Sequence, residues 1–387
     1  MMTPRDITIE GFDMPRHHAA AVLPAPRARL SVERMPTPDP AAGEVVVRVH
    51  AAAVNPIDWV IQGTGSVTYR WLPTPAVLGS DVAGEVVAIG SEVARFRVGD
   101  RVFGLATGTD RGRDSRREGA FQQYTTLLEH LTAPIPDGIS DVEASVLPLG
   151  ASTAACALFQ PRHLGLAIHD PADAGPRDRG VVVVWGGSTS VGMNAIQLAR
   201  AAGYDVVSTA SPRNADLVRS LGADVVADHG SPRAVDDLVA GIGGRPVVGA
   251  VALGETSTAG CLEVLRRTGG SVLAMASMPV SLAELAGRRR LFPAMLPTFA
   301  RLGLRTLLLN ARARRAGIRA AFIWGTSLRD DEIGRRLWGR LLPQWLADGT
   351  VRPLPEPVVA GHGVGAIQEA LDRQRAGVSA RKIVVTL

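Results

Sequence analysis

Small and hydroxylated residues follow an apolar run in VVVVWGGSTSVG, residues 181–192. The run has the composition of a buried strand, and a helical apolar pattern begins directly after Gly192. A strand that turns straight into a helix presents free backbone N–H groups and the positive end of the helix dipole, which together bind phosphate. The chemistry expected of this turn is therefore the binding of a nucleotide's pyrophosphate.

The glycines of this turn are spaced almost as in the dinucleotide pattern G-x-G-x-x-G. Gly187 and Gly192 take the outer positions, and Thr189 stands where a middle glycine normally lets the backbone approach the pyrophosphate. A β-branched residue there predicts that the phosphates lie slightly farther out, and that the hydroxyls of Ser188, Thr189 and Ser190 bind them. A tight turn that binds no ligand is the alternative, because a short glycine pattern alone is weak evidence.

The end of the next predicted strand indicates which nucleotide binds. In such sites an acidic residue about 20 residues after the glycines binds the adenosine ribose of NAD, but TASPRN contains no carboxylate and the first is Asp216. Ser211 and Arg213 instead offer a hydroxyl and a guanidinium, which suit a 2′-phosphate. We therefore predict NADPH rather than NADH. Ser211 could also cap a helix that starts at Pro212.

The elements around the turn alternate regularly. From about residue 153 to 327, near-continuous apolar strands alternate with amphipathic helices, which predicts a doubly wound parallel α/β sheet covered on both faces. Such a sheet places all its strand ends at one edge. From residue 17 to about 150, short strands broken by proline and glycine predict a smaller, partly closed β structure. The final strand, RKIVVTL, is expected to pack back on that N-terminal domain.

The composition fits a globular protein of two domains, with 387 residues, 46% of them hydrophobic and 20% charged. Cys156 and Cys261 are too few for a disulfide framework, and their separation matches no metal-binding spacing. The N-terminus has no apolar signal-peptide segment, and no uncharged apolar run is long enough to span a membrane. A reducing, cytoplasmic location is expected.

Positive charge is concentrated in one segment. The whole chain carries a formal charge of +5, yet residues 281–326 contain nine arginines against Glu284 alone, a net charge of +8. Apolar stretches such as LFPAMLPTF lie among these arginines, so we expect long, basic, amphipathic helices. The segment could line a substrate pocket or a dimer surface, or it could dock an acidic partner such as a carrier protein. No nucleic acid partner is expected.

A series of motifs occurs in order along almost the whole chain. They are AAAVNPIDW (51–59), PAVLGSDVAGEVVAIGSEVARFRVGDRVFG (75–104), GAFQQY (119–124), LPLGASTAAC (147–156), VVVVWGGSTSVGMNAIQLA (181–199), TASPRNADLVRSLGAD (209–224) and VSARKIVV (378–385). Together they resemble the medium-chain dehydrogenase/reductase superfamily, and most closely its zinc-independent branch of quinone oxidoreductases and trans-acting enoyl reductases.

The resemblance implies a fold of two domains. A GroES-like, β-rich catalytic domain would comprise residues 1–152 and 328–387. A Rossmann NADP-binding domain would comprise residues 153–327, with the basic helical insertion at about 281–319. The active site would lie in the cleft between them, and relatives of this kind are often homodimers.

The resemblance also implies which residues contact the cofactor. Asn55 and Thr153 would approach the nicotinamide from one side, and Leu253 and Gly254 would line the other side. The pyrophosphate would contact Gly187, Ser188, Thr189, Ser190, Val191 and Gly192. The 2′-phosphate would contact Ser211, Arg213 and Asn214.

Two further positions carry open alternatives. His229, after the predicted strand ADVVAD, could lie against the adenine or be an ordinary loop histidine. Lys382, the only lysine in the chain, and Ile383 could close the cofactor site from the tail. Lys382 could equally be a solvated lysine near the C-terminus.

Zinc ligands are missing from the positions where the zinc enzymes of this superfamily carry them. The Gly-His-Glu motif of those enzymes reads Gly79-Ser80-Asp81 here, and no cysteine lies near residues 55–59. Two cysteines also cannot form the four-cysteine structural lobe of those enzymes. Because a zinc site needs three or four sulfur, nitrogen or oxygen ligands, we predict no metal.

Without zinc, the acid that would polarise the oxygen in alcohol oxidation is missing. Hydride transfer to an activated C=C bond demands less of the protein. The substrate's own carbonyl spreads the charge as an enolate, while the protein hydrogen-bonds that oxygen and protonates carbon. We therefore predict an NADPH-dependent reductase of an enone, a quinone or an enoyl thioester, free or bound to a carrier protein.

Candidate catalytic residues are few. Tyr69 follows NPIDW, where some enoyl reductases carry a catalytic tyrosine, although the spacing here differs. Asn55, Asp58 and Thr153 could orient the substrate or the cofactor, and water is an alternative proton source. The competing hypothesis is a non-catalytic NADPH-binding protein that docks an acidic partner through the arginine-rich insertion.

Overall fold

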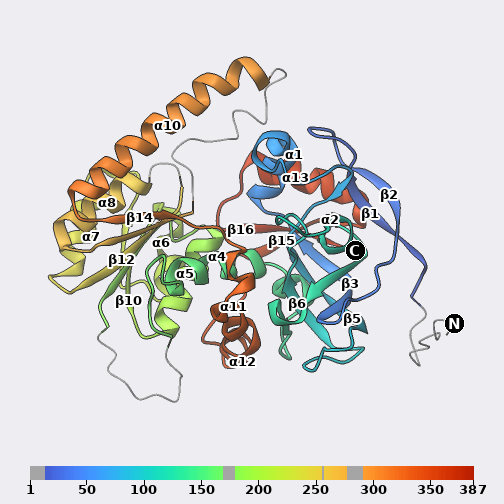
Figure 1. Cartoon of the computed structure of the whole chain (residues 1–387). Helices are drawn as coiled ribbons and strands as arrows, with labels where there is room; N and C mark the ends of the chain where they lie inside the picture. The colour runs from blue at the N-terminus through green and yellow to red at the C-terminus, as the bar shows by residue number, and fades with distance from the viewer. Residues whose placement is uncertain (1–13, 169–178, 255–256, 277–290) are drawn as a thin grey trace.

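The chain folds into two domains that lie side by side (Figure 1). The computed structural model describes residues 14–168, 179–254, 257–276 and 291–387. One domain is built on a parallel sheet flanked by helices, and the other is built on largely antiparallel sheets. The fold class expected from the sequence is confirmed.

The Rossmann sheet has six parallel strands in the described part of the chain, in the order β11-β10-β9-β12-β13-β14. The strands are β9 (Val181–Trp185), β10 (Asp205–Ala210), β11 (Val225–Asp228), β12 (Val247–Ala252), β13 (Val272–Met275) and β14 (Arg319–Phe322). The chain enters the sheet at β9 and adds β10 and β11 on one side of it. It then crosses back and adds β12, β13 and β14 on the other side. The loops after β9 and β12 therefore leave opposite faces, which opens a crevice at the carboxyl edge of the sheet.

Strand β9 lies at the centre of the domain because every one of its side chains is apolar. Val182 and Val184 pack into the same apolar cluster as Met193, whereas Val181 and Val183 pack on the opposite face. All four valines are fully buried, and each contributes about 2 kcal/mol relative to an exposed position. A near-continuous apolar strand is what burial on both faces requires.

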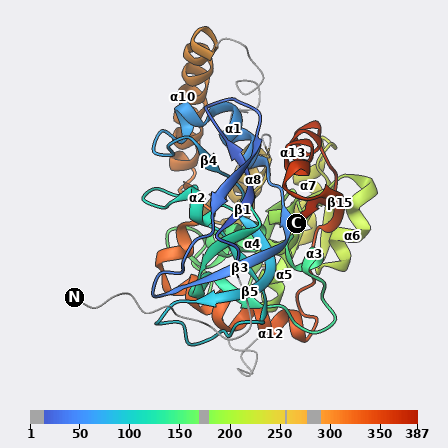
Figure 2. The same ribbon diagram turned by 90° about the vertical axis from the view of Figure 1, so that its right-hand side faces the viewer.

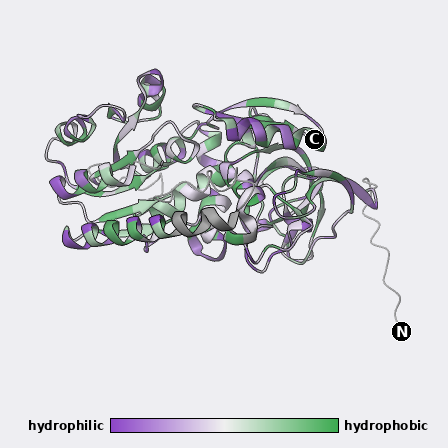
Figure 3. Cartoon of the chain, turned by 90° about the horizontal axis from the view of Figure 1, so that it is seen from above, coloured by the Kyte–Doolittle hydropathy of each residue, from purple (hydrophilic) through white to green (hydrophobic). Residues whose placement is uncertain are grey.

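Helices follow the strands in turn. They are α5 (Ser190–Ala201), α6 (Ala215–Ser220), α7 (Ala234–Ile242) and α8 (Ser257–Thr268), with the short η2 (Pro212–Asn214) before α6. Apolar and polar residues alternate along these helices, as the hydropathy colouring shows (Figure 3). The apolar positions face the sheet and leave the polar positions on the outside.

The N-terminal domain contains a three-stranded and a seven-stranded sheet. The smaller sheet joins β1 (His17–Leu23), β2 (Ser31–Pro36) and β4 (Ala76–Val77); the larger joins β3 (Glu44–Ala53), β5 (Asp81–Ile89), β6 (Arg101–Leu105), β7 (Tyr124–Leu128), β8 (Thr132–Pro134), β15 (Glu356–His362) and β16 (Arg381–Thr386). Helices α1 (Pro56–Thr68), α2 (Ser115–Glu118) and α3 (Asp141–Ala144) and the turn η1 (Glu129–Leu131) connect them.

The C-terminal tail completes this domain, as the sequence predicts. Strand β16 pairs antiparallel with β3, where Val384 lies opposite Ala53, and parallel with β15. Between β15 and β16 the chain forms η5 (Val364–Ala366) and α13 (Ile367–Ala376), which packs against α1. Figure 2 shows the C-terminus and α13 beside the N-terminal strands.

The segments that connect the domains are helical. Helix α4 (Pro148–Phe159) enters the Rossmann domain, and η3 (Ser327–Asp330), α11 (Glu332–Arg336), η4 (Leu337–Leu341) and α12 (Leu342–Ala347) lead back from it. The boundaries proposed at 152/153 and 327/328 fall inside α4 and η3. Trp338 and Trp345 bury their rings beside these connections and help to fix one domain on the other.

Part of the basic insertion forms a single long helix, α10 (Leu291–Arg315), which runs along the outer edge of the Rossmann domain (Figure 1). Residues 281–290 of the proposed insertion lie outside the described residues. On α10 the side chains of Leu304, Leu307 and Leu308 are 58%, 66% and 49% exposed. These three leucines face solvent, whereas Ala313 on the same helix is buried and Leu309 packs against the core of the Rossmann domain.

One helical stretch, Asp141–Phe159, is long and apolar enough to cross a membrane by length and composition. Within the protein, however, 83% of its most apolar window is buried. It includes α4, which packs against α5. The burial is that of a core helix, so the stretch is weak evidence for a membrane span.

Candidate active site

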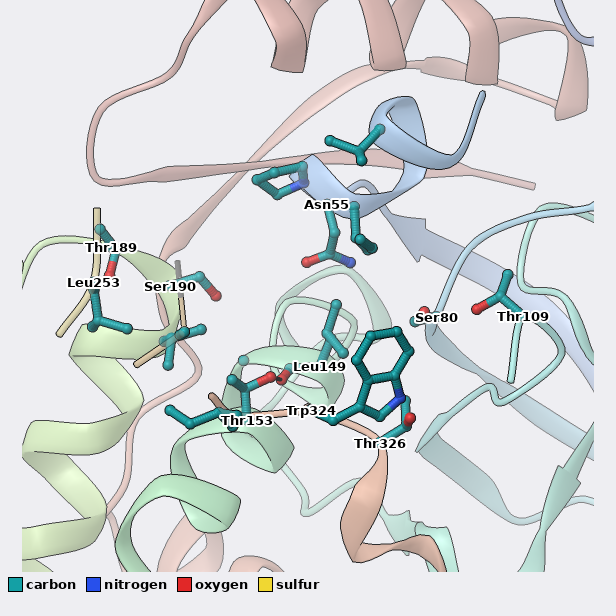
Figure 4. Close-up of a pocket in the computed structure, with 18 of the residues that line it drawn as sticks. Asn55, Ser80, Thr109, Leu149, Thr153, Thr189, Ser190, Leu253, Trp324 and Thr326 are labelled. Atoms are coloured by element: carbon teal, nitrogen blue, oxygen red, sulfur yellow. Dashed lines mark hydrogen bonds between the residues drawn. The ribbon is translucent and has the colours of Figure 1, made fainter. Parts of the chain in front are cut away.

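A cavity of about 530 Å³ lies at the carboxyl edge of the Rossmann sheet, where the two domains meet (Figure 4). We call one side the Rossmann half, which is lined by Gly150, Thr189, Ser190, Val191, Leu253 and Gly254. We call the other side the aromatic half, which is lined by Tyr69, Thr109, Asp110, Phe322, Trp324 and Thr326. Asn55 and Thr153 also line the cavity.

The glycines of the first turn are needed because neighbouring atoms leave no room for a side chain. A Cβ at Gly187 would meet Ser208 Oγ at 2.2 Å, and one at Gly192 would meet the backbone oxygen of Gly186 at 2.3 Å. Gly186 itself has a φ of +93°, a conformation that glycine adopts without steric cost. The outer glycines therefore let α5 begin immediately against the end of β9.

Two of the three hydroxyls expected at the phosphates have different surroundings. Thr189 Oγ1 accepts a hydrogen bond from the N–H of Gly192 at 3.0 Å and donates to the oxygen of Gly186 at 2.8 Å. It thus caps α5, and its hydroxyl proton is already used within the turn. Ser190 Oγ is buried, lines the cavity and has no hydrogen-bond partner in the described structure.

The unpartnered Ser190 hydroxyl is the observation that tests the fit of a nucleotide. A buried polar atom without a partner is costly, and a phosphate at the helix N-terminus would supply the missing acceptor. Gly254, which also lines the cavity, has open space where a side chain would be. These residues fit a dinucleotide, with Ser190 and the start of α5 at its pyrophosphate.

The residues proposed for the 2′-phosphate lie together just beyond β10. Ser211 precedes η2 and makes no side-chain cap hydrogen bond there, so the capping alternative is not observed. Arg213 is exposed, and Asn214 Nδ2 donates to Ser379 Oγ of the tail at 3.1 Å. Asp216, the first carboxylate after the strand, faces solvent and pairs with Arg219 at 2.7 Å.

His229 follows β11 at the same edge of the sheet. Its backbone N–H lies 3.4 Å from the oxygen of Ala210, which places it next to the end of β10. The side chain is exposed. The structure thus brings His229 near the proposed adenosine end, and both alternatives for its role stay open.

A buried polar network lies behind the middle of the cavity. Lys382 Nζ lies 2.8 Å from Asp81 Oδ2 and donates to Asn55 Oδ1 at 2.5 Å. Asn55 Nδ2 in turn donates to Asp81 Oδ2 at 2.8 Å. The N–H of Leu149, on the way into α4, donates to Asp81 Oδ1 at 2.6 Å. Both atoms of the Asn55 amide are therefore held in one orientation at the cavity wall.

The network decides between the two interpretations of Lys382. Its side chain is only 4% exposed, so the solvated-lysine alternative is wrong. Ile383 is 1% exposed and belongs to the core of the N-terminal domain. Lys382 and Ile383 do not line the cavity themselves. The tail therefore acts on the cavity through Asn55.

Comparison with known proteins identifies the family. The model of the alcohol dehydrogenase GroES-like domain matches residues 41–137. The chain is 45% identical to the dehydrogenase pigH of Monascus ruber, over 95% of this chain and 99% of that protein. It is 38% identical to the trans-enoyl reductase himH of Aspergillus japonicus, over 89% of this chain and 90% of that protein.

The chain belongs to the medium-chain dehydrogenase/reductase superfamily. A solved structure, that of an alcohol dehydrogenase superfamily protein from Novosphingobium aromaticivorans, is similar with a TM-score of 0.71 and 26% identity, over 96% of this chain and 99% of that one. The recognition made from the sequence motifs is confirmed. As a member of this superfamily, the protein is an oxidoreductase whose fold binds a nicotinamide cofactor.

Tyr69 lies in the aromatic half of this dehydrogenase/reductase cleft. It ends α1, lines the cavity, and is 7% exposed. Burial, with smaller contributions from the charges of Asp110 and Asp58, raises the pKa of its phenol well above the usual range. The phenol therefore stays protonated at physiological pH and can donate a hydrogen bond into the cavity.

Asp58 does not reach the cavity. Its carboxylate is fully buried under α1, and its Oδ2 accepts from the N–H of Asn55 at 2.7 Å. Burial raises the pKa of this carboxyl to about 7. Asp58, which was expected to orient the substrate or the cofactor, instead contacts the backbone of Asn55 and does not line the cavity.

Thr153 and the loop after β12 both line the cavity. Thr153 Oγ1 donates to the oxygen of Leu149 at 2.7 Å within α4 and faces the cavity. Leu253 and Gly254 line the same cavity. The structure thus brings together around one cavity the two groups of residues proposed for the two faces of a nicotinamide.

The donor set at the Gly-His-Glu position does not fit zinc. Ser80 lines the cavity beside Asp81, but the Asp81 carboxylate is already neutralised by Lys382. Within the described residues, no group of three or more histidine, cysteine, aspartate or glutamate side chains could hold a metal ion. A cation here would have to displace the ammonium group of Lys382.

Sequence reasoning missed Asp110 and Trp324 in the aromatic half. Trp324 follows the last Rossmann strand in AAFIWGT, and an aromatic residue at a strand's carboxyl end was the available signal. Asp110 lies in the loop after β6 and lacks any recognisable motif. Its Oδ1 accepts from Thr326 Oγ1 at 2.7 Å across the domain boundary.

Proposed function

We propose that the protein reduces a C=C bond conjugated to a carbonyl, in an enone, a quinone or an enoyl thioester, with NADPH as the hydride donor. The observation that supports this proposal best is the single cavity that joins the start of α5 to Tyr69 and Asn55. Relatives named trans-enoyl reductase agree with it. A nicotinamide nucleotide supplies the hydride when it is bound.

The preference for NADPH rests on charge at the end of β10. Ser211 and Arg213 are positioned beside Asn214, whose amide is tied to Ser379 of the tail. The nearest carboxylate, Asp216, points to solvent and is paired. A guanidinium without a competing carboxylate favours a 2′-phosphate over a free ribose hydroxyl.

The chain's own residues would stabilise the charge that develops on the substrate. Reduction adds hydride to the β carbon and leaves negative charge on the carbonyl oxygen as an enolate. The neutral phenol of Tyr69 donates a hydrogen bond to that oxygen, and a proton from this phenol or from water then adds to the α carbon. Asn55, fixed by Lys382 and Asp81, and Thr153 limit where the ring of the cofactor can lie.

Steady-state oxidation of NADPH with an enone, a quinone and an enoyl thioester tests the proposal. The wild-type protein should turn over at least one of these substrates. Tyr69→Phe keeps the ring in the aromatic cluster and removes only the hydroxyl, so it should lower kcat about 100-fold with little change in NADPH affinity. NADPH binding without turnover of any of the three substrates would contradict the proposed reaction.

A second candidate function is that of an NADPH-binding protein that docks an acidic partner. The exposed leucines of α10, with Arg301 and Arg305 on the same helix, are the observation that favours it. Its signature would be affinity for an acidic carrier protein that falls steeply with added salt, combined with NADPH binding and no turnover. An affinity for the acidic carrier protein that did not change with salt would contradict this second candidate function.

A further inference from the structure

Three aromatic rings from distant segments meet in the aromatic half. The ring centroid of Tyr69 lies 5.0 Å from that of Trp71 and 5.7 Å from that of Trp324, and the two indoles are 6.2 Å apart. Tyr69 and Trp71 follow α1 in the N-terminal domain, whereas Trp324 follows β14 in the Rossmann domain. Spacings of this size are those of favourable aromatic contacts.

Trp324 and its neighbour Phe322 are exposed to the cavity. Both line it, and their side chains remain 37% and 42% exposed. In Figure 4 the indole of Trp324 lies below Asn55 and beside Leu149. Large aromatic surface left open inside a concave site is available to a ligand, because its burial stabilises a complex.

The indole of Trp324 is held in place from both domains. Asp110 is buried and accepts from Thr326 Oγ1 at 2.7 Å and from Arg329 Nη1 at 3.2 Å, and it also hydrogen-bonds the side chain of Trp324. Gly325 passes so close to α4 that a Cβ there would meet Thr153 Oγ1 at 2.3 Å. The ring is therefore presented in one orientation before a substrate arrives, which lowers the entropic cost of binding.

Charge at the cavity wall limits the chemistry of what can bind. Asp110 is the one formally charged side chain among the described residues that line the cavity. It is a carboxylate, and its partners Thr326 and Arg329 already use its oxygens. A neutral group can enter here, whereas the described residues that line the cavity offer no cationic side chain to a substrate carboxylate.

We infer that Trp324 sets the substrate specificity, and that the cavity selects neutral acceptors with a flat aromatic or conjugated group next to the reacting C=C bond over short aliphatic acceptors. The inference rests on the proposed function and names the substrate class for the same site. The flat group stacks on the indole while the carbonyl oxygen lies within reach of Tyr69. Asp110 and Thr326 act as positioning residues for the indole.

Benzylideneacetone and its methyl analogue, ethylideneacetone, test the inference, because they share one enone and differ only in phenyl against methyl. With NADPH, kcat/KM of the wild-type protein should favour the phenyl compound at least tenfold. Trp324→Leu should reduce that ratio about tenfold, because KM should rise more for the phenyl compound than for the methyl compound. Trp324→Phe, which keeps a ring, should retain most of it. An unchanged ratio in Trp324→Leu would overturn the inference.

Two further variants test the positioning of the ring. Thr326→Val removes the hydroxyl that bonds Asp110, and should raise KM for the phenyl enone about threefold, more than it raises KM for the methyl enone. Thr326→Ser keeps the hydroxyl and should restore the wild-type KM. NADPH affinity and the thermal midpoint, measured for every variant, show whether the fold and the Rossmann half are intact. An equal rise in both KM values would contradict a role through Trp324.

Binding of the saturated ketones separates this inference from the proposed reaction. Calorimetric titration of the protein with NADP⁺ present should show tighter binding of benzylacetone than of its methyl analogue, pentanone, and Trp324→Leu should abolish the difference. If no substrate is turned over but this preference is present, the proposed reaction is wrong and the aromatic specificity stands. If the wild-type protein binds both ketones equally or binds neither, the specificity inference is wrong.

Discussion

The Rossmann half of the cleft is built from neighbouring strand ends, whereas the aromatic half joins segments from across the chain. Thr189, Ser190, Leu253 and Gly254 follow β9 and β12, which pair directly in one sheet. Tyr69, Asp110 and Trp324 follow α1, β6 and β14, in two different domains. The Rossmann half therefore depends on local backbone geometry, and the aromatic half depends on contacts between the domains.

The two halves also differ in how their polar groups are satisfied. The Rossmann half leaves the Ser190 hydroxyl without a partner, which suits a ligand that completes it. In the aromatic half and the network behind it, Asp110 and Asp81 already have their partners within the protein. The Rossmann half therefore lacks a hydrogen-bond partner that a ligand can supply, and the aromatic half offers a fixed apolar surface.

Removal of Lys382 should have the largest effect, because it leaves the fully buried Asp81 carboxylate without its counter-charge. Lys382→Met should lower the free energy of unfolding by about 3–5 kcal/mol, as measured by denaturant unfolding. The double variant Asp81→Asn with Lys382→Met should recover much of this loss. Arg381→Met, one residue away and paired with Glu356 at the surface, should cost at most about 1 kcal/mol. Equal losses in the two single variants would contradict the buried network.

Two buried groups, one in each domain, should respond to pH with opposite signs. Burial raises the pKa of Asp58 to about 7. The folded state therefore keeps a proton that the unfolded chain releases near its ordinary value of 3.8. The contribution of Asp58 to the free energy of unfolding is therefore complete below pH 3.8. It is lost as the pH rises through 7, and the total loss is about 4 kcal/mol. Asp58→Asn should remove this decline in unfolding experiments across the pH range.

His163, at the end of α4, has the opposite sign. Burial, with smaller effects from Arg162 and Arg319, lowers the pKa of its imidazole to about 4 from 6.5. Its neutral form is favoured in the fold, so stability is full above 6.5 and falls by about 3 kcal/mol as the pH drops toward 4. His163→Phe should flatten that acid-side loss and leave the Asp58 decline unchanged. If the free energy of unfolding changed with pH in the same way in Asp58→Asn and His163→Phe, the two losses of stability would not belong to these two residues.

A side chain at Gly192 should damage the Rossmann half selectively. In Gly192→Ala the new Cβ would meet the Gly186 oxygen at 2.3 Å, so we expect a loss of about 1–3 kcal/mol in stability and at least a tenfold loss in NADPH affinity. Gly303→Ala on α10, where nothing lies within 4 Å, is the matched control and should stabilise slightly. Benzylacetone binding by the folded fraction should change less than NADPH binding. Normal NADPH affinity in Gly192→Ala would contradict the role of this turn.

The smallest effect is expected at the adenosine end. Arg213→Ala should weaken NADPH binding about tenfold and leave NADH binding within a factor of two, because only NADPH carries the 2′-phosphate. Arg219→Ala, in the helix that follows, is the control, since its guanidinium pairs with Asp216. Fluorescence titration of both nucleotides measures the ratio. An equal loss of affinity for NADH and NADPH in Arg213→Ala would show that Arg213 does not bind the 2′-phosphate.

The sequence predicts the Rossmann half well because its information is local. The strand, glycine turn and helix of residues 181–201 lie in one continuous stretch, and parallel strands must place their carboxyl ends at one edge. The N-cap role of Thr189 was not predicted. A hydroxyl at that position can bind either a ligand or its own backbone, and only the geometry distinguishes the two.

The aromatic half could be predicted only in part, because its partners are far apart in the chain. Tyr69 was predicted from its place after NPIDW. The hydrogen bond between Asp110 and Thr326 joins residues 216 positions apart, and no motif marks either of them. Burial of Lys382 depends on β16 crossing to β3, which places its side chain on the inner face. The sequence pattern predicts strand β16 and its packing on the N-terminal domain. It does not predict that Lys382 is the residue of this strand that contacts Asn55.

Calorimetric titration of the wild-type protein with NADPH and NADH measures whether this cleft binds a nicotinamide nucleotide at the turn before α5. We expect one NADPH bound per chain, with an affinity at least tenfold higher than that for NADH. The absence of heat with both nucleotides, at protein concentrations where the fold is intact, would contradict it.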